Sequence, residues 1–319
     1  MRTARIKYQG GGAYYHCINR CGGYADERPL GELEKEMFVK LLRRLDQFYT
    51  VEVISYVVMS NHFHVVLYAS GKKAGVEETV ARYNAYYEGR RVMTPESPGL
   101  PAVQDRLCDF SMLMKDLQQL FTMWFNESRA KRRRGRLWGD RFKSVLLDGK
   151  TALWSCVKYV ELNPVRAGLV NEPGDYRHSS WGAWHGCGRH PCGGAFLRHM
   201  ARTLGDGAHF CSANQVAAEL KGDMARTIAA EQDGATSESI QSAYRRAKEE
   251  GVRVASFLRK AAYWSNGAVI GTQGFVRMVA IDVLGVGRAE KRRLCEARSL
   301  TGEGFFSLCR GRAGPGDLG

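Results

Sequence analysis

The sequence lacks any apolar run of the roughly 18 residues that a membrane-spanning helix needs. Residues 1–7 also lack the apolar core of a signal peptide. The nine cysteines are odd in number and follow no regular spacing, so no disulfide framework is indicated. These absences argue against a secreted or membrane protein, and we expect a cytoplasmic location with reduced thiols.

Acidic residues are scarce relative to basic ones. The 33 Asp and Glu residues face 47 Lys and Arg residues, which gives a net charge of +14. Such an excess favours a polyanionic partner, either nucleic acid or an anionic membrane surface. Because no membrane segment is evident, we expect nucleic acid and no membrane partner.

Two histidines flank one apolar residue in residues 56–68, a stretch rich in Val and Tyr. Side chains two positions apart in a strand point the same way, so His62 and His64 would present two imidazoles on one face. Such a pair suits a metal ion. Two structural histidines on a half-buried strand would give the same pattern.

Hydrophobic periodicity predicts a sheet with helices packed on it. Strands are expected at 13–20, 51–59, 62–69 and 137–147, and helices at 32–48, 109–127 and 151–162. The Ser60-Asn61 turn signal joins the second and third strands into a hairpin. The order β-α-β-β-α-β-α predicts an α+β domain with an antiparallel sheet. Residues 70–107 form a polar insert without a clear period.

A domain boundary is expected near residue 185. The residues rich in Gly, Cys and His at 182–194 are the predicted linker, and 195–310 is a mostly helical C-terminal extension of unknown role. Its clearest helical segments are 252–262 and 274–284.

One cluster in the predicted linker could bind zinc, because thiols and imidazoles are zinc ligands. Its spacing matches no standard zinc module, and its glycines suggest a loose loop. The cluster consists of His185, Cys187, His190 and Cys192.

The predicted helix 151–162 offers a nucleophile beside its apolar stripe. Tyr159 and Asn163 share one face, since residues four apart on a helix are neighbours. The Tyr159 phenol could act as a nucleophile, and the Asn163 amide oxygen as a third, hard metal ligand. Alternatively, Tyr159 is an ordinary tyrosine at the edge of the core, and Asn163 only ends the helix before Pro164.

Two motifs together resemble the signatures of single-tyrosine HUH transposases, in particular the REP-associated tyrosine transposases. They are the His62-Phe-His64 strand and the segment 159–170, Tyr-Val-Glu-Leu-Asn-Pro-Val-Arg-Ala-Gly-Leu-Val. Residues 15–20, Tyr-His-Cys-Ile-Asn-Arg, are similar to the first strand of that family. The likeness covers residues 10–185 and implies an HUH, ferredoxin-like palm.

The resemblance implies a role for each matching residue. His62 and His64 correspond to the metal-binding pair, Asn163 to the third metal contact, and Tyr159 to the nucleophile that attacks a DNA phosphate. The implied metal is Mg²⁺ or Mn²⁺. The implied activity is single-stranded DNA nicking and strand transfer beside hairpin-forming palindromes, through a 5′-phosphotyrosine intermediate.

Single-stranded or hairpin DNA is therefore the expected partner, and a homodimer is compatible with the sequence. A groove for single strands needs cations interleaved with aromatic residues, and the segment after residue 130 has both. The expected DNA contacts are Arg20, Arg132, Arg133, Arg134, Arg136, Arg141 and Lys143.

Two other functions are open at this point. The first is a catalytically idle protein that binds hairpin DNA in a regulatory role, although such a protein has no need of His62, His64 and Tyr159 together. The second is a replication or relaxation initiator. Those proteins usually carry a helicase or a second tyrosine, and the sequence has neither a Gly-x-x-x-x-Gly-Lys-Ser/Thr loop nor a paired tyrosine on the 151–162 helix.

Overall fold

The computed structural model describes residues 5–8, 10–23, 28–129, 135–204, 212–236, 264, 267–291, 294–298 and 304–309. These residues belong to two compact units that interleave along the chain. The histidine unit consists of residues 7–144 and 159–199, and the C-terminal unit of 1–6, 145–158 and 200–319. The sequence-based boundary near residue 185 stays a prediction.

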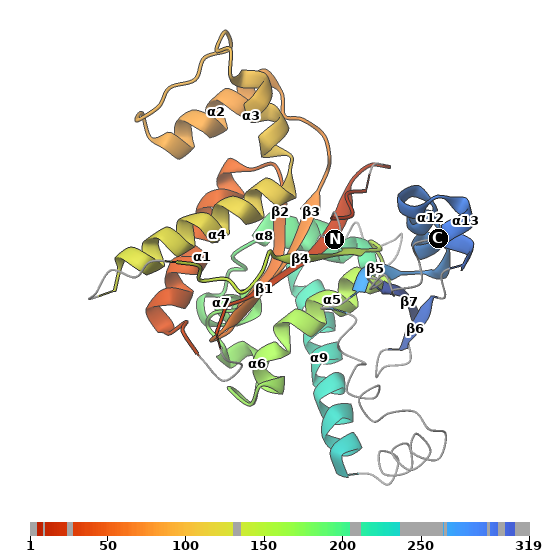
Figure 1. Ribbon diagram of the computed structural model, residues 1–319. Helices are drawn as coiled ribbons and strands as arrows, with labels where there is room; N and C mark the ends of the chain where they lie inside the picture. Colours follow the sequence, from red (N-terminus) through yellow and green to blue (C-terminus); the bar gives the residue numbers. More distant parts are fainter. Residues whose placement is uncertain are drawn as a thin grey trace. The chain divides into compact units, whose positions relative to one another are not determined.

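The sheet of the histidine unit has the order β2-β3-β1, with β1 (Ala13–Arg20), β2 (Glu52–Val58) and β3 (His62–Ala69) (Figure 1). Both pairings are antiparallel, which confirms the predicted first strand and hairpin. Valine and aromatic residues favour these strands because their side chains pack well on a pleated surface. The register places Arg20 opposite His62 and Ile18 opposite His64.

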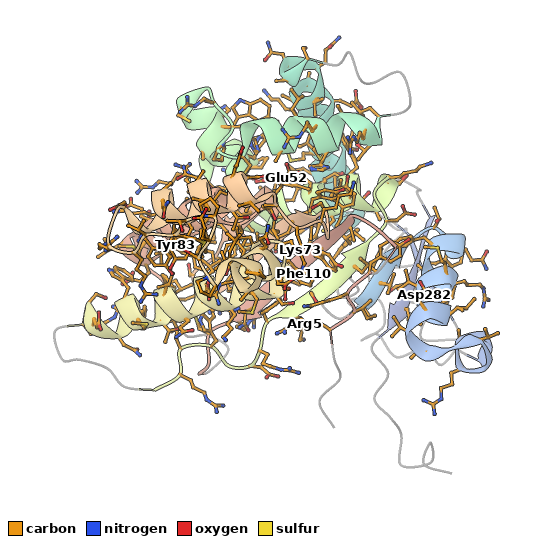
Figure 2. The ribbon with its side chains drawn as sticks, turned by 90° about the horizontal axis from the view of Figure 1, so that it is seen from above. Arg5, Glu52, Lys73, Tyr83, Phe110 and Asp282 are labelled. Atoms are coloured by element: carbon orange, nitrogen blue, oxygen red, sulfur yellow. The ribbon has the colours of Figure 1, made fainter. Side chains whose placement is uncertain are left out.

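Helices α1 (Glu32–Phe48) and α4 (Phe110–Glu127) cover the sheet face that bears Phe63. The Phe38 ring lies 4.8 Å from Phe63 and 5.4 Å from Phe121, between ring centroids. Phe110, labelled in Figure 2, stacks on Tyr15 with ring centroids 3.9 Å apart. Full burial of each such ring stabilises the fold by roughly 1.5–3 kcal/mol. We call this side of the sheet the Phe63 face.

The polar insert between residues 70 and 107 contains two helices, although its sequence shows no clear period. Helix α2 (Val76–Tyr87) and helix α3 (Leu100–Leu107) lie in contact with one another (Figure 1). Three half-buried tyrosines of α2, Tyr83, Tyr86 and Tyr87, contact Phe48 of α1. Tyr86, for example, stacks on Phe48 with ring centroids 4.3 Å apart.

The elements after α4 follow the predicted order with shifted bounds. Strand β4 (Lys143–Leu147) begins later than expected, and helix α5 (Thr151–Glu161) ends close to the predicted position. A short helix, α6 (Asn163–Arg166), begins where the chain was expected to leave helical geometry. Pro164 fits there because proline is tolerated in a first helical turn. The predicted linker contains much of helix α7 (Ser180–Cys187) and precedes most of helix α8 (Gly193–Thr203).

The C-terminal unit combines helices with strands that the sequence analysis did not foresee. Its strands follow the order β4-β5-β7-β6, with β4 and β5 parallel and the other pairs antiparallel. Among the described residues after 205, the elements are α9 (Ala213–Thr236), β5 (Gly267–Gly271), α12 (Gln273–Leu284), α13 (Val286–Lys291), β6 (Cys295–Arg298) and β7 (Gly304–Cys309).

The α+β prediction is confirmed, and α12 matches the predicted helix at 274–284. The predicted helix at 252–262 lies outside the described residues. Within the described part of the chain, no helix is both long and apolar enough to cross a membrane.

Candidate active site

Three imidazoles lie together on the side of the β2-β3-β1 sheet opposite the Phe63 face. His62 and His64 come from β3 and His16 from β1, because alternate residues of a strand point to the same side. The His16 and His64 rings stack with centroids 5.1 Å apart, and the His62 and His64 centroids are also 5.1 Å apart. We call this set of three residues the histidine face. The sequence analysis missed the contribution of His16.

Hydrogen bonds hold the two predicted metal ligands through the same ring atom. The Nδ1 atom of His62 lies 2.7 Å from Asn61 Oδ1, and Nδ1 of His64 lies 2.9 Å from His16 Nε2. When each Nδ1 carries the proton, each Nε2 keeps its lone pair for a metal ion. His16 is thus placed to fix the tautomer and ring orientation of His64.

Burial keeps these imidazoles neutral. Burial, together with the smaller effect of the Arg20 and Arg28 charges, lowers the pKa of His62 to about 4. Burial also holds the pKa of His64 well below its usual value, with smaller contributions from His16 and His62. A metal ligand must be unprotonated, so both side chains are ready to bind near pH 7.

Helix α5 brings Tyr159 to the histidine face. Its ring centroid lies 5.7 Å from that of His64 and 6.0 Å from that of His16, with both contacts edge-on. Tyr159 is half-buried, whereas the stripe of α5 beside it is buried. Helical spacing thus places one phenol where the sheet presents its imidazoles.

Asn163 is the first residue of α6 and follows the end of helix α5. Its Nδ2 donates to the carbonyl oxygens of Tyr159, at 2.8 Å, and Val160, at 3.4 Å. These bonds add partners to carbonyls in the last turn of α5, where the helix itself supplies few donors. The amide nitrogen faces the helix, so the amide oxygen is the atom left for a ligand. The role of Asn163 as a metal contact stays a prediction.

The donor set fits a divalent cation as a partial shell. Two imidazole nitrogens and one amide oxygen would leave positions for water or phosphate oxygens, which hard cations favour. Across the described residues, no three His, Cys, Asp or Glu side chains are grouped closely enough to hold a metal ion.

The possible zinc cluster in residues 185–192 is therefore not assembled. His190 stacks on Phe196 with ring centroids 4.0 Å apart, and its Nδ1 accepts a hydrogen bond from the Cys192 backbone nitrogen at 3.1 Å. Cys187 Sγ donates to the Arg189 carbonyl oxygen at 3.2 Å. The side chains of His190 and Cys187 therefore bond to backbone atoms or pack on a ring, and they do not converge on a shared metal position.

Cations lie around the histidine face. Arg20 is exposed and pairs in register with His62. Arg166, which the sequence analysis did not select, lies with its guanidinium carbon 5.4 Å from the Tyr159 ring centroid. Among the other predicted DNA contacts, the exposed residues are Arg136, Arg141 and Lys143, whereas Arg132, Arg133 and Arg134 lie outside the described residues. None of these assignments is tested by the fold, and they stay predictions.

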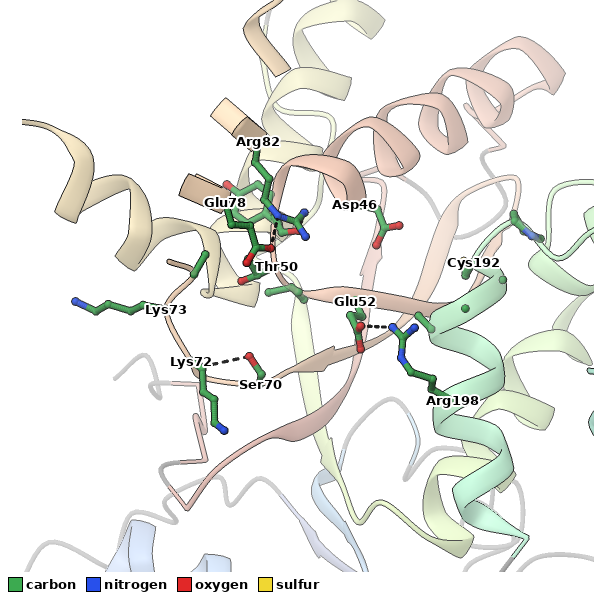
Figure 3. Close-up of a pocket in the computed structure, with 17 residues that line it drawn as sticks. Asp46, Thr50, Glu52, Ser70, Lys72, Lys73, Glu78, Arg82, Cys192 and Arg198 are labelled. Atoms are coloured by element: carbon green, nitrogen blue, oxygen red, sulfur yellow. Dashed lines mark hydrogen bonds and ion pairs between the residues drawn. The ribbon is translucent and has the colours of Figure 1, made fainter. Parts of the chain in front are cut away.

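A cavity of about 580 Å³ lies at the other end of β2 and β3, away from His62 (Figure 3). Four of its charged residues form ion pairs: Arg198 of α8 with Glu52 of β2, and Arg82 with Glu78 at 2.8 Å. Figure 3 shows Glu52 and Arg198 pointing toward each other. Burial raises the pKa of the Cys192 thiol in its wall well above the usual value, which makes that thiol a poor nucleophile.

Comparisons with known proteins include a distant structural likeness. No protein-family model matches the chain, and no curated protein matches it. One similar solved structure is that of a REP-associated tyrosine transposase bound to a REP hairpin. The similarity covers 59% of this chain and 87% of the chain in that structure. The identity is 16% and the TM-score 0.39, values too low to carry an argument about function.

Proposed function

We propose that the protein is a metal-dependent single-stranded DNA nickase and strand transferase that acts beside hairpin-forming palindromes. The observation that carries this proposal is the position of Tyr159, whose ring lies 5.7 Å from His64 and 6.0 Å from His16 between centroids. A nucleophile beside anchored, neutral imidazoles is what metal-assisted attack on a phosphodiester requires.

In the proposed reaction, Tyr159 Oη bonds to the phosphorus and the bond from phosphorus to the 3′ oxygen breaks. The 3′ oxygen leaves as a hydroxyl, and the 5′ phosphate stays on the protein as a phosphotyrosyl ester. Because an ester replaces an ester, a 3′-hydroxyl can reverse the step and join a strand without ATP. A free tyrosine, with a pKa of about 10, is protonated near pH 7, so the Tyr159 proton must pass to a base or to water during the attack.

A divalent cation would be held by His62, His64 and Asn163. When bound there, Mg²⁺ or Mn²⁺ would neutralise the negative charge on a non-bridging phosphate oxygen. The protein's own contribution is to keep both Nε2 lone pairs available through the Asn61 and His16 hydrogen bonds. Arg20 and Arg166 would contact phosphates on either side of the reacting group.

A labelled hairpin oligonucleotide with a single-stranded flank tests the proposal in Mg²⁺ or Mn²⁺. We expect a covalent adduct with the 5′ side of the cleaved strand, abolished by Tyr159→Phe. The matched control Tyr83→Phe changes another half-buried tyrosine, on α2, and should leave the adduct intact. If the wild type binds the hairpin but forms no adduct with any divalent ion, the proposal is wrong and a hairpin-binding regulatory role replaces it.

A further inference from the structure

The last turn of α5 is tied to two neighbouring elements by one buried carboxylate. Glu161, 1% exposed, accepts a hydrogen bond from Ser55 Oγ of β2 at 2.8 Å. It also accepts from the Trp181 backbone nitrogen at 3.1 Å and from the Ser180 hydroxyl, both at the start of α7. The Ser180 hydroxyl in turn accepts from the Tyr56 backbone nitrogen at 3.2 Å. We call Glu161, Ser55, Ser180 and the Trp181 amide the Glu161 clamp.

Burying a carboxyl group costs more free energy than burying an apolar side chain, and burial raises the pKa of Glu161 above its ordinary value. Within the described part of the chain, no cation lies within ion-pair distance of Glu161, so hydrogen bonds alone offset the loss of its hydration. An apolar side chain of similar size would fill the same space without that desolvation penalty. Directional hydrogen bonds fix the position of the Glu161 carboxyl group. Three donors on two elements can all bond to it in only one placement.

That fixed position lies two residues from Tyr159. The Asn163 amide holds the Tyr159 carbonyl from the other side of the same turn, at 2.8 Å. Ser55 and His64 belong to paired strands and point to the same side of the sheet, since Ser55 pairs with Val66 and Val57 with His64. The clamp therefore connects the turn that bears Tyr159 to the sheet that bears the imidazoles.

We infer that Glu161 is a positioning residue, which sets the placement of the Tyr159 phenol relative to the histidine face. This inference rests on the proposed function of Tyr159 only where activity is the readout. Glu161 itself touches neither DNA nor the reacting atoms. Misplacing a reactive group by about 1 Å can lower a rate on the order of 100-fold, so a small shift of this turn is sufficient.

Two substitutions at Glu161 separate position from charge. Glu161→Ala removes every contact of the clamp, and we expect kcat for cleavage to fall on the order of 10- to 100-fold with KM and hairpin affinity unchanged. Glu161→Gln should restore most of the rate. Its amide oxygen can accept from the Trp181 nitrogen, and its amide nitrogen can donate to the two serine hydroxyls.

Glu34→Ala is the matched control. Glu34 is another buried carboxylate of the histidine unit, and it accepts from the Gly31 nitrogen at 2.9 Å and pairs with Arg129 at 2.6 Å. It belongs to α1, which covers the Phe63 face. We expect this variant to lower the melting temperature while kcat stays at the wild-type value.

A spectroscopic readout is independent of activity. With 3-fluorotyrosine incorporated, the ¹⁹F resonance that disappears in Tyr159→Phe reports the phenol, which lies edge-on to two imidazole rings. Glu161→Ala should shift or broaden this resonance, whereas Glu161→Gln and Glu34→Ala should not. Ser55→Ala removes a single bond of the clamp, so a smaller shift of the same sign is expected even where Glu161→Ala does not fold.

An unchanged Tyr159 resonance in folded Glu161→Ala or in Ser55→Ala would overturn the inference, as would equal losses of kcat in Glu161→Ala and Glu34→Ala. Failure of the wild type to form an adduct would instead overturn the proposed function. The resonance would still decide whether Glu161 positions Tyr159.

Discussion

The two sides of strand β3 have different roles in the histidine unit. On β3, Phe63 points to a fully buried aromatic core with Phe38, whereas His62 and His64 point to hydrogen-bonded polar groups on the other side. The Phe63 face stabilises the sheet through apolar burial. The histidine face holds the imidazoles that can bind a metal ion. A strand with a period of two can therefore separate stability from chemistry between adjacent residues.

The largest expected effect separates these roles at neighbouring positions. Phe63→Ala should lower the free energy of unfolding by about 3–5 kcal/mol, because it leaves a cavity in the aromatic core. His62→Ala should abolish cleavage while sparing most of the hairpin affinity and the stability. Denaturant unfolding and the oligonucleotide assay measure both. Cleavage by His62→Ala at the wild-type rate would remove the metal assignment.

The next effect concerns the hydrogen bond between the histidines. His16→Ala removes the partner of His64 Nδ1, and we expect Mn²⁺ affinity to fall about 10- to 100-fold, the usual cost of losing a group that orients a metal-bound histidine. Titration followed by electron paramagnetic resonance measures free Mn²⁺ without DNA. Equal affinities of His16→Ala and wild type would show that His16 serves only packing.

A buried histidine away from the histidine face shows what burial alone does. Burial lowers the pKa of His190 to about 3, and its Nε2 has no hydrogen-bond partner among the described residues. In the unfolded chain His190 gains a proton below a pKa of about 6.5, whereas in the folded protein it stays neutral down to about pH 3. The free energy of unfolding therefore falls as the pH decreases toward 3. Between pH 7 and 5 this costs about 2 kcal/mol. His190→Phe should remove that part of the pH dependence in denaturant unfolding, and Mn²⁺ affinity should not change.

The smallest expected effect concerns the cations at the rim. Arg20→Gln should weaken hairpin binding for every sequence and reduce the slope of log affinity against log salt by about one, as expected for the loss of one phosphate contact. Lys221→Gln, an exposed cation on α9, is the matched control. An identical reduction in both variants would assign the effect to net charge alone.

Local patterns predicted much of the fold and only part of the site. Helix 32–48 followed from apolar periodicity, because its buried positions recur at helical spacing. Strand 13–20 and the 51–69 hairpin followed instead from their β-branched and aromatic residues and the flanking turn signals, and these strands are buried along nearly their whole length. Helix α2 was missed since its contacts use half-buried tyrosines, whose polar and apolar character hides the period.

His16 was missed for a different reason. Its place beside His64 depends on the register between β1 and β3, which are far apart along the chain, and no local spacing reports that register. Tyr159 could be predicted because two local spacings each indicate one half of the site. The two-residue spacing of a strand indicates His62 and His64, and the four-residue spacing of a helix indicates Tyr159 and Asn163. The contacts of Glu161 with Ser55 and Ser180 likewise join residues far apart along the chain, so no local pattern predicts the Glu161 clamp.

The central claim is that Tyr159 is the group that attacks DNA, and mass spectrometry of the protease-digested adduct tests it most directly. The wild type should yield one nucleotide-bearing peptide, with the 5′ phosphate on Tyr159. A nucleotide on any other residue, or an adduct that persists in Tyr159→Phe, would contradict the account.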